Sequence, residues 1–181
     1  MDAGSPVTIP VKLDEKTFKR FARYDMFVLR KRWIKPVVFS LILLAFSAVA
    51  LWTGKQQAGL IAAVLLTVGL GLPLVYFGTF LSQVNMQALK QKLNPPRTVY
   101  TVIFEDEYLE VHNNRKQEET LKLEWEKVRQ AIRVKGCIYL YVTAAKAFLL
   151  PDHQANVPDE EVWNFLVSHL GKEKCRKTCS A

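Results

Sequence analysis

Three histidines and three cysteines are the residues of this chain whose chemistry most readily supports catalysis or metal binding. An active site needs such groups as nucleophile, base and orienting partner in a defined arrangement. His112, His153 and His169 stand apart from any serine or cysteine in a recognised catalytic setting. We therefore interpret all three as solvated surface histidines, with His169 near a helix end that favours a cation.

A metal site in the C-terminal tail is the next hypothesis. His169, Cys175 and Cys179 offer three ligands, but a Cys-x₃-Cys pair with one loosely spaced histidine does not match a structural zinc site. With Cys137, the cysteine count is odd, which argues against a disulfide framework and suits a reducing compartment. We predict no metal and no cofactor, and we interpret residues 172–181 as a disordered basic tail within reach of anionic lipid.

The remaining candidates also favour structural roles. Glu105-Asp-Glu107 has the composition of a solvated turn, and Gly136 and Gly171 are too isolated to form a phosphate-binding loop. Four aromatic residues suggest a ligand pocket or a core, and in so small a sheet the core is favoured: Trp125, Tyr139, Tyr141 and Phe148. We predict no catalytic, cofactor-binding or metal-binding residues, and no enzymatic activity.

The net charge of +8 is distributed unevenly. Residues 1–97 carry a net charge of +9, whereas residues 98–181 carry −1 and the span 98–171 carries −4. A basic excess confined to one half argues against a nucleic-acid-binding domain. A few basic residues remain a possible local patch for an acidic or lipidated ligand: Lys127, Arg129, Arg133 and Lys135.

Two long apolar segments lie within this basic half. Pro36–Trp52 and Ala58–Leu81 contain no Asp, Glu, Lys or Arg. A bilayer span needs roughly 20 apolar residues, so the first segment is near the lower limit and the second is comfortably long enough. A signal peptide ending near Ala48-Val-Ala50 is disfavoured because its basic region would be far too long. We predict a two-helix transmembrane hairpin at residues 34–81, with Gly69, Gly71 and Pro73 producing a kink and close helix packing.

Basic residues set the expected orientation of the hairpin. They are dense before the first apolar segment and recur after the second, whereas the connector of residues 53–57 has only Lys55. Cytoplasmic flanks carry such an excess of lysine and arginine. We therefore predict a multi-pass protein of the inner (cytoplasmic) cell membrane with both termini in the cytosol.

The N-terminal arm, residues 1–33, contains a β-like stretch, Val7–Leu13, and a predicted helix from Lys16 to Arg32 with Asp14 as its N-cap. Two interpretations of this helix remain open. It lies on the membrane surface, or it extends the first transmembrane helix. Whether the β-like stretch joins the C-terminal sheet is a further open question.

A small α+β domain is predicted at residues 98–171, after a juxtamembrane linker at 82–97 that ends in a double proline. Six short segments alternate between apolar and polar residues and are separated by turns, which indicates an antiparallel sheet or small barrel. An amphipathic helix beginning at Pro158 and ending at Gly171 follows. Six strands and one closing helix are the outline of a pleckstrin-homology-like domain.

The order of these features resembles the YcxB-like family of bacterial membrane proteins. The resemblance covers nearly the whole chain and is carried by the helix containing Phe18, Phe21 and Tyr24, by the Val102–Val111 hairpin, and by two later segments, Leu123–Val128 and Tyr139–Pro151. It implies a pleckstrin-homology-like C-terminal domain beside two membrane helices, and it implies no reaction.

The sequence therefore predicts a membrane-anchored, non-enzymatic interaction or scaffolding module. Its expected partners are the lipid bilayer and, through the cytosolic domain, another protein or a second copy of the chain. The alternative is a transport or assembly component that oligomerises through the hairpin.

Overall fold

The computed structural model describes residues 6–114, 120–144 and 146–178, which form two compact units. One unit is Lys19–Lys92, and the other combines Met1–Phe18 with Leu93–Ala181. The elements are β1 (Val7–Leu13), α1 (Glu15–Tyr24), the π-helix η1 (Asp25–Leu29), α2 (Ile34–Trp52), α3 (Ala58–Lys90), β2 (Arg97–Phe104), β3 (Tyr108–Asn113), β4 (Thr120–Glu124), the 3₁₀-helix η2 (Trp125–Lys127), β5 (Gln130–Val134), β6 (Cys137–Tyr141), β7 (Ala147–Pro151), α4 (Asp159–Leu170) and β8 (Cys175–Lys177).

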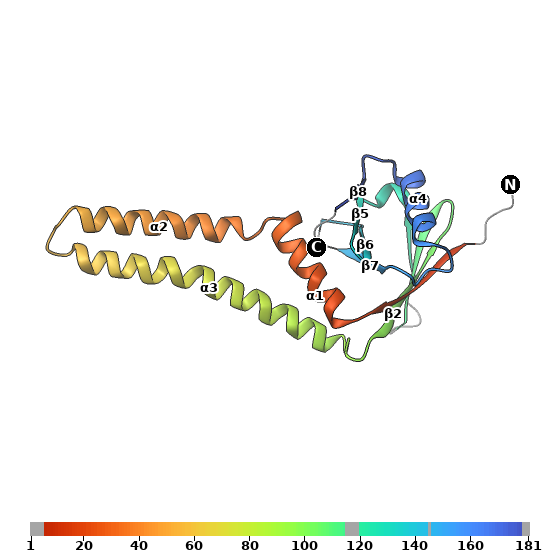
Figure 1. Cartoon of the computed structure of the whole chain (residues 1–181), viewed down its shortest axis with the longest axis horizontal. Helices are drawn as coiled ribbons and strands as arrows, with labels where there is room; N and C mark the ends of the chain where they lie inside the picture. The colour runs from red at the N-terminus through yellow and green to blue at the C-terminus, as the bar shows by residue number, and fades with distance from the viewer. Residues whose placement is uncertain (1–5, 115–119, 145, 179–181) are drawn as a thin grey trace. The chain divides into compact units, whose positions relative to one another are not determined.

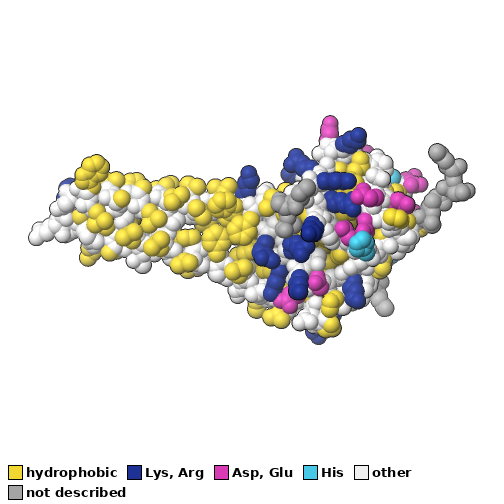
Figure 2. Space-filling model, in the orientation of Figure 1, with side chains coloured by type: hydrophobic (Ala, Val, Ile, Leu, Met, Phe, Trp, Pro, Cys, Tyr) yellow, Lys and Arg dark blue, Asp and Glu magenta, His cyan; other side chains and the backbone are white. Residues whose placement is uncertain are grey.

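Helices α2 and α3 lie side by side as an antiparallel hairpin (Figure 1). Both are long and apolar enough to cross a membrane, and only 11% of the apolar window of each is buried. Figure 2 shows their surface covered by hydrophobic side chains. Leucines such as Leu60 and Leu74, each 73% exposed, would be unfavourable in water.

Gly69 is where α3 approaches α2 most closely among the glycines of this helix. A Cβ atom built on Gly69 would lie 3.4 Å from side-chain atoms of Leu43 and Leu44, whereas one built on Gly71 would have no neighbour within 4 Å. The predicted close packing is therefore present at Gly69 and absent at Gly71. α3 continues through Pro73 without an assigned break.

The strand β1 pairs antiparallel with β2, from Val7 opposite Phe104 to Leu13 opposite Arg97. This pairing answers the question that the sequence left open, because the N-terminal strand is part of the same sheet as the C-terminal segments. The first sheet has the order β1-β2-β3-β4. The predicted alternation is confirmed at Val102 and Leu109, which are fully buried, whereas Leu121 of β4 remains 36% exposed.

The second sheet has the order β7-β6-β5-β8, and its last strand was not predicted. We expected residues 172–181 to be disordered, which is wrong for Cys175–Lys177, because these residues pair in parallel with β5. β6 is buried at all five positions. Tyr139 and Tyr141 on one face of the strand, and Ile138 and Leu140 on the other, are therefore all shielded from solvent.

The expected α+β arrangement is thus present, and the described residues form eight strands where six were predicted for residues 98–171. Neither four-stranded sheet closes on itself, so the structure has two open sheets where a barrel was one of the two predicted forms. α4 begins after Pro158 and ends at Gly171, whose φ of +80° is suited to glycine, as predicted. Phe165 of α4 stacks on Phe104, with ring centroids 5.5 Å apart.

Candidate functional site

The segment between α1 and α2 departs from the continuous helix that the sequence predicted over Lys16–Arg32. After α1 the chain widens into the π-helix η1, and Arg32 N donates to Met26 O at 3.0 Å. Lys31 then adopts a left-handed conformation with φ of +47°. π-Helical turns and left-handed non-glycine residues are uncommon and cluster at functional sites.

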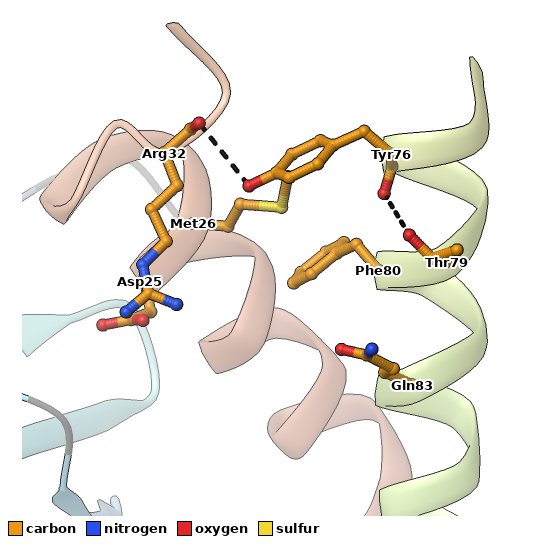
Figure 3. A pocket seen from close by; sticks show the side chains of 7 residues that line it. All are labelled: Asp25, Met26, Arg32, Tyr76, Thr79, Phe80 and Gln83. Carbon is orange, nitrogen blue, oxygen red and sulfur yellow. Dashed lines mark hydrogen bonds between the residues drawn. The ribbon is translucent and has the colours of Figure 1, made fainter. Parts of the chain in front are cut away.

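A polar pocket of about 280 Å³ lies between this segment and α3 (Figure 3). We call it the hairpin-base pocket. Asp25, Met26 and Arg32 line one side. The other side consists of four α3 residues spaced at i, i+3, i+4 and i+7, which places them on one helix face: Tyr76, Thr79, Phe80 and Gln83.

Hydrogen bonds and ring contacts fix the walls of the hairpin-base pocket. Tyr76 donates its hydroxyl to the Arg32 carbonyl at 3.5 Å, and Thr79 donates to the Tyr76 carbonyl at 2.9 Å (Figure 3). Phe27 of η1 stacks on Phe77 of α3, with ring centroids 6.0 Å apart. The unusual backbone of η1 is therefore held against α3 and not free to unwind independently.

The charges that line the pocket are one carboxylate and one guanidinium. Asp25 is paired with Arg30, whose Nε lies 2.9 Å from Oδ2. Arg32 is exposed, and within the described part of the chain it forms no salt bridge. The lining residues offer a carboxylate, a guanidinium, an amide, two hydroxyls and apolar surface, a set of groups that can bind a small polar ligand.

A second concavity, of about 480 Å³, lies in the folded domain between the first sheet and β7. We call it the sheet groove. Its floor includes Tyr100, Val111, Leu121 and Phe148, and Leu121 on β4 remains 36% exposed. Lys146 lies over Phe148, with Nζ 5.3 Å from the ring centroid. The sheet groove therefore combines apolar side chains with the polar side chains of Asn113 and Thr120 and one cation, Lys146.

The three histidines lie on separate elements. His112 is on β3, with Nε2 3.4 Å from Glu110, and His153 follows β7, with Nδ1 2.9 Å from Asp159. His169 was expected on the solvated surface but is half-buried, and its ring stacks on Phe165 at 4.1 Å. The described residues include no cluster of His, Cys, Asp or Glu that could hold a metal.

Cys175 lies on β8, and Cys179 is outside the described residues. Burial raises the pKa of the Cys175 thiol, which disfavours the reactive thiolate. Cys137 is only 2% exposed. Neither described cysteine is thus placed as a nucleophile, and their positions suit packing.

The four aromatic residues considered for a pocket are all buried, as the core interpretation predicted: Trp125, Tyr139, Tyr141 and Phe148. The basic patch is less available than its sequence suggested. Lys127 pairs with Glu124 at 3.1 Å. Arg133 Nη1 is 2.8 Å from Glu160, although the alignment is not that of a hydrogen bond.

Sequence reasoning did not find the hairpin-base pocket. Arg32 and Tyr76 are 44 residues apart, and no local pattern brings them together. The available signal was the i, i+3, i+4, i+7 set on α3, in which Tyr76, Thr79 and Gln83 add polar groups to a largely apolar helix. No family model, curated protein or solved structure matches the chain.

Proposed function

We propose that the chain is a membrane-anchored, non-enzymatic interaction module. One observation carries the proposal: the apolar hairpin is inserted between β1 and β2, which are neighbouring strands of one sheet. Leu13, where the chain leaves the sheet, is paired with Arg97, where it returns. A chain that crosses a bilayer within such an insertion must cross an even number of times, so the two helices act as a hairpin anchor.

The dimensions of the two helices support this anchor. α2 has 19 residues and α3 has 33. At 1.5 Å per residue, α2 is about 28 Å long, close to the roughly 30 Å of hydrocarbon in a bilayer. Their exposed surface is apolar, which distinguishes them from the buried core helices of a soluble protein.

We place the folded domain and both termini on the cytosolic side of the inner membrane. The support is the concentration of basic residues before α2 and after the apolar part of α3, against a single lysine, Lys55, in the connector. The unit that contains the folded domain, residues 1–18 and 93–181, carries 15 Lys/Arg and 16 Asp/Glu, a net charge of −1, so it has no basic excess. Bulk attraction to anionic lipid is therefore not its basis for binding.

The sheet groove is the surface we assign to a protein partner or to a second copy of the chain. Leu121 leaves apolar area exposed on β4, the last strand in its sheet. Tethering to the membrane raises the effective concentration of the domain for other proteins on that surface. The proposal includes no reaction. It also includes the YcxB-like and pleckstrin-homology-like relationship, for which the support is the order of motifs along the sequence.

A transport role for the hairpin has less support. Its two buried serines donate hydrogen bonds within the hairpin, Ser40 to the Gly69 carbonyl and Ser47 to the Ala62 carbonyl. The apolar segments bring no charged side chain into the space between the helices. These features suit a packed anchor more than a conduit.

The test is a map of membrane topology on the full chain. Reporters active only in the cytosol, and reporters active only outside it, would be fused after Leu93, after Ala181 and, in separate proteins, at Gln56. We expect cytosolic signals at the first two positions and an external signal at Gln56. Opposite signals at Leu93 and Ala181, or a cytosolic signal at Gln56, would contradict the hairpin anchor.

The interaction role is tested separately with the purified chain in nanodiscs. We expect Leu121→Glu to reduce self-association, or binding of a protein partner, measured by mass photometry. The control Lys127→Glu changes an exposed residue outside the groove. An equal effect of both substitutions would count against the sheet groove as the binding surface.

A further inference from the structure

We propose that the hairpin-base pocket binds the phosphate of an anionic phospholipid headgroup, with Arg32 as the principal contact. The inference rests on the proposed function, because it requires α2 and α3 to lie in a bilayer. It adds a specific lipid-binding site to the anchor. A hairpin held in the membrane only by its apolar surface would not need such a site.

The pocket lies at the level where headgroups are found. Ser40 is opposite Gly69 and Ser47 is opposite Ala62, so the two helices run past each other residue for residue. Continuing this register places Trp33 opposite Tyr76, and the Tyr76 hydroxyl does reach the neighbouring Arg32 carbonyl. At the same level lies the boundary of the uncharged part of α2, which starts at Pro36 after Lys35. Tryptophan and tyrosine favour this depth in a membrane.

The charge of the pocket suits an anion. Arg30 neutralises Asp25, with Nε 3.0 Å from Oδ1 and 2.9 Å from Oδ2. Arg32 lines the same pocket, is exposed, and forms no salt bridge with another residue that the structure describes. Its guanidinium is a planar donor that matches two phosphate oxygens at once. The exposed amide of Gln83 adds a neutral donor from the opposite wall.

The size and floor of the pocket suit a headgroup. Its volume of about 280 Å³ is below the range typical of sites for drug-sized molecules, and it opens to the surface. Met26, 3% exposed, and Phe80 provide apolar surface beside the polar groups. A phosphate would meet Arg32 and Gln83, while the glycerol carbons would lie against Met26 and Phe80.

The site is formed before any ligand arrives. The bond from Arg32 N to Met26 O and the bond from the Trp33 indole to the Phe27 carbonyl, at 3.1 Å, hold the backbone around Arg32. An ordered backbone at Arg32 lowers the conformational entropy lost on binding, compared with an arginine on a mobile segment. We therefore expect Arg32 to discriminate among lipids more than its equally basic neighbours do.

The experiment uses the full-length chain in nanodiscs of phosphatidylcholine with increasing phosphatidylglycerol, and native mass spectrometry counts the phosphatidylglycerol molecules retained. We compare Arg32→Gln with Lys35→Gln, which removes the same charge one helical turn away and does not line the pocket. A third variant, Thr79→Phe, fills the pocket and keeps every charge.

We expect Arg32→Gln to weaken retention of phosphatidylglycerol about tenfold, as for the loss of a hydrogen bond between charged groups. Thr79→Phe should have a similar effect and Lys35→Gln an effect below about twofold, the size of a screened surface charge. Equal effects of Arg32→Gln and Lys35→Gln, or full retention by Thr79→Phe, would overturn the pocket as the site.

Three further outcomes distinguish failure of the lipid site from failure of the proposed membrane anchor. Displacement of the lipid by millimolar inorganic phosphate would overturn the assignment to a phospholipid. Release of the wild-type chain from vesicles by alkaline carbonate would overturn the proposed membrane anchor, and the lipid site with it. A chain that stays in the vesicles but retains phosphatidylcholine equally well would overturn only the lipid selectivity.

Discussion

Pro73 shows how one residue in α3 accounts for a polar contact in α2. Proline has no N–H, so the carbonyl of Gly69, four residues earlier, lacks its helical partner. The hydroxyl of Ser40 donates to that carbonyl instead. An unsatisfied carbonyl is costly in hydrocarbon, and a serine at this position of α2 is thereby explained.

We predict a coupled effect of substitutions at Ser40 and Pro73. Ser40→Ala should destabilise the hairpin by about 1 kcal/mol, in the range measured for hydrogen bonds between membrane helices. In a Pro73→Ala background the N–H of residue 73 can donate a hydrogen bond to the Gly69 carbonyl, so Ser40→Ala should then have little effect on the stability of the hairpin. A double-mutant cycle from thermal unfolding in detergent measures this coupling.

Ser47 supplies the control for this cycle. It donates to the Ala62 carbonyl at 3.1 Å, but no proline follows four residues later, and that carbonyl keeps its helical partner. Ser47→Ala should therefore cost less than Ser40→Ala and should not couple to Pro73→Ala. Additive effects of Ser40→Ala and Pro73→Ala would refute the account.

Tyr100 plays a comparable role between the two sheets. Its hydroxyl accepts from the N–H of Leu149 at 2.7 Å and donates to the carbonyl of the same residue at 3.0 Å. Tyr100→Phe leaves both backbone groups of β7 without this partner, and we expect a loss of about 1–3 kcal/mol in the free energy of unfolding. Tyr108→Phe, whose hydroxyl has no partner among the described residues, should be within about 0.5 kcal/mol of wild type.

The stability difference between wild type and Tyr100→Phe should also depend on pH. Burial raises the pKa of Tyr100 far above its ordinary value of 10.0. The contribution of this hydroxyl is complete below pH 10 and declines above it, because only the unfolded chain then ionises. Unfolding measured from pH 8 to pH 11 should therefore show the two proteins converging at the alkaline end.

Some residue roles could be predicted from the sequence because they act locally. Asp14 was expected to cap α1, and its Oδ1 accepts from the N–H of Thr17 at 2.9 Å. Burial acts to raise the pKa of Asp14, but the hydrogen bonds from Thr17 outweigh it and hold that pKa below 3.8. The hydrogen bond from Ser40 to the Gly69 carbonyl could not be predicted in this way. It depends on how the two helices are aligned, and no local sequence pattern specifies that alignment.

At the scale of elements, the free edge of β1 is covered by side chains of the segment after β7. Gln154 binds both backbone groups of Lys12, accepting from its N–H at 2.6 Å and donating to its carbonyl at 2.9 Å. Asn156 accepts from the N–H of Thr8 at 2.9 Å. Pro10, between them, has no N–H to offer. Exposed edges invite pairing with other chains, and these amides occupy this one.

We predict that Gln154→Ala and Asn156→Ala open different parts of this edge. Gln154→Ala should speed hydrogen exchange at the Lys12 amide about fivefold and leave Thr8 unchanged, since each hydrogen bond contributes about 1 kcal/mol. Asn156→Ala should do the reverse, so each variant is the control for the other. Residue-resolved exchange measurements decide this, and equal acceleration at both amides would indicate fraying of the whole strand instead.

The strands that the sequence predicted differ from the one it missed in a physical way. β3 alternates between Leu109 and Val111 on one side and polar residues on the other, so its pattern can be read locally. β8 has the sequence Cys-Arg-Lys and little intrinsic strand preference. It is held by parallel pairing to β5, from Ala131 opposite Cys175 to Arg133 opposite Lys177.

For the whole molecule, the insertion of the hairpin makes a direct prediction. Because Leu13 and Arg97 are opposite each other, a two-residue Asn-Gly turn should be able to replace residues 14–96. We expect the shortened chain to be water-soluble and to keep the β1–β2 pairing, measured by circular dichroism and hydrogen exchange. A matched chain with Ile9→Asp, which places a charge at a position 2% exposed, should fail to fold.

The same insertion imposes an order on biosynthesis. β1 precedes both apolar helices in the chain, and its partner β2 follows them. In the proposed membrane-anchored protein, α2 and α3 would therefore enter the bilayer while β1 is still an unpaired strand with apolar side chains such as Ile9 and Val11. The first sheet can be completed only after both helices have been synthesised, so under the proposed anchoring the domain would acquire its fold at the membrane and not before reaching it.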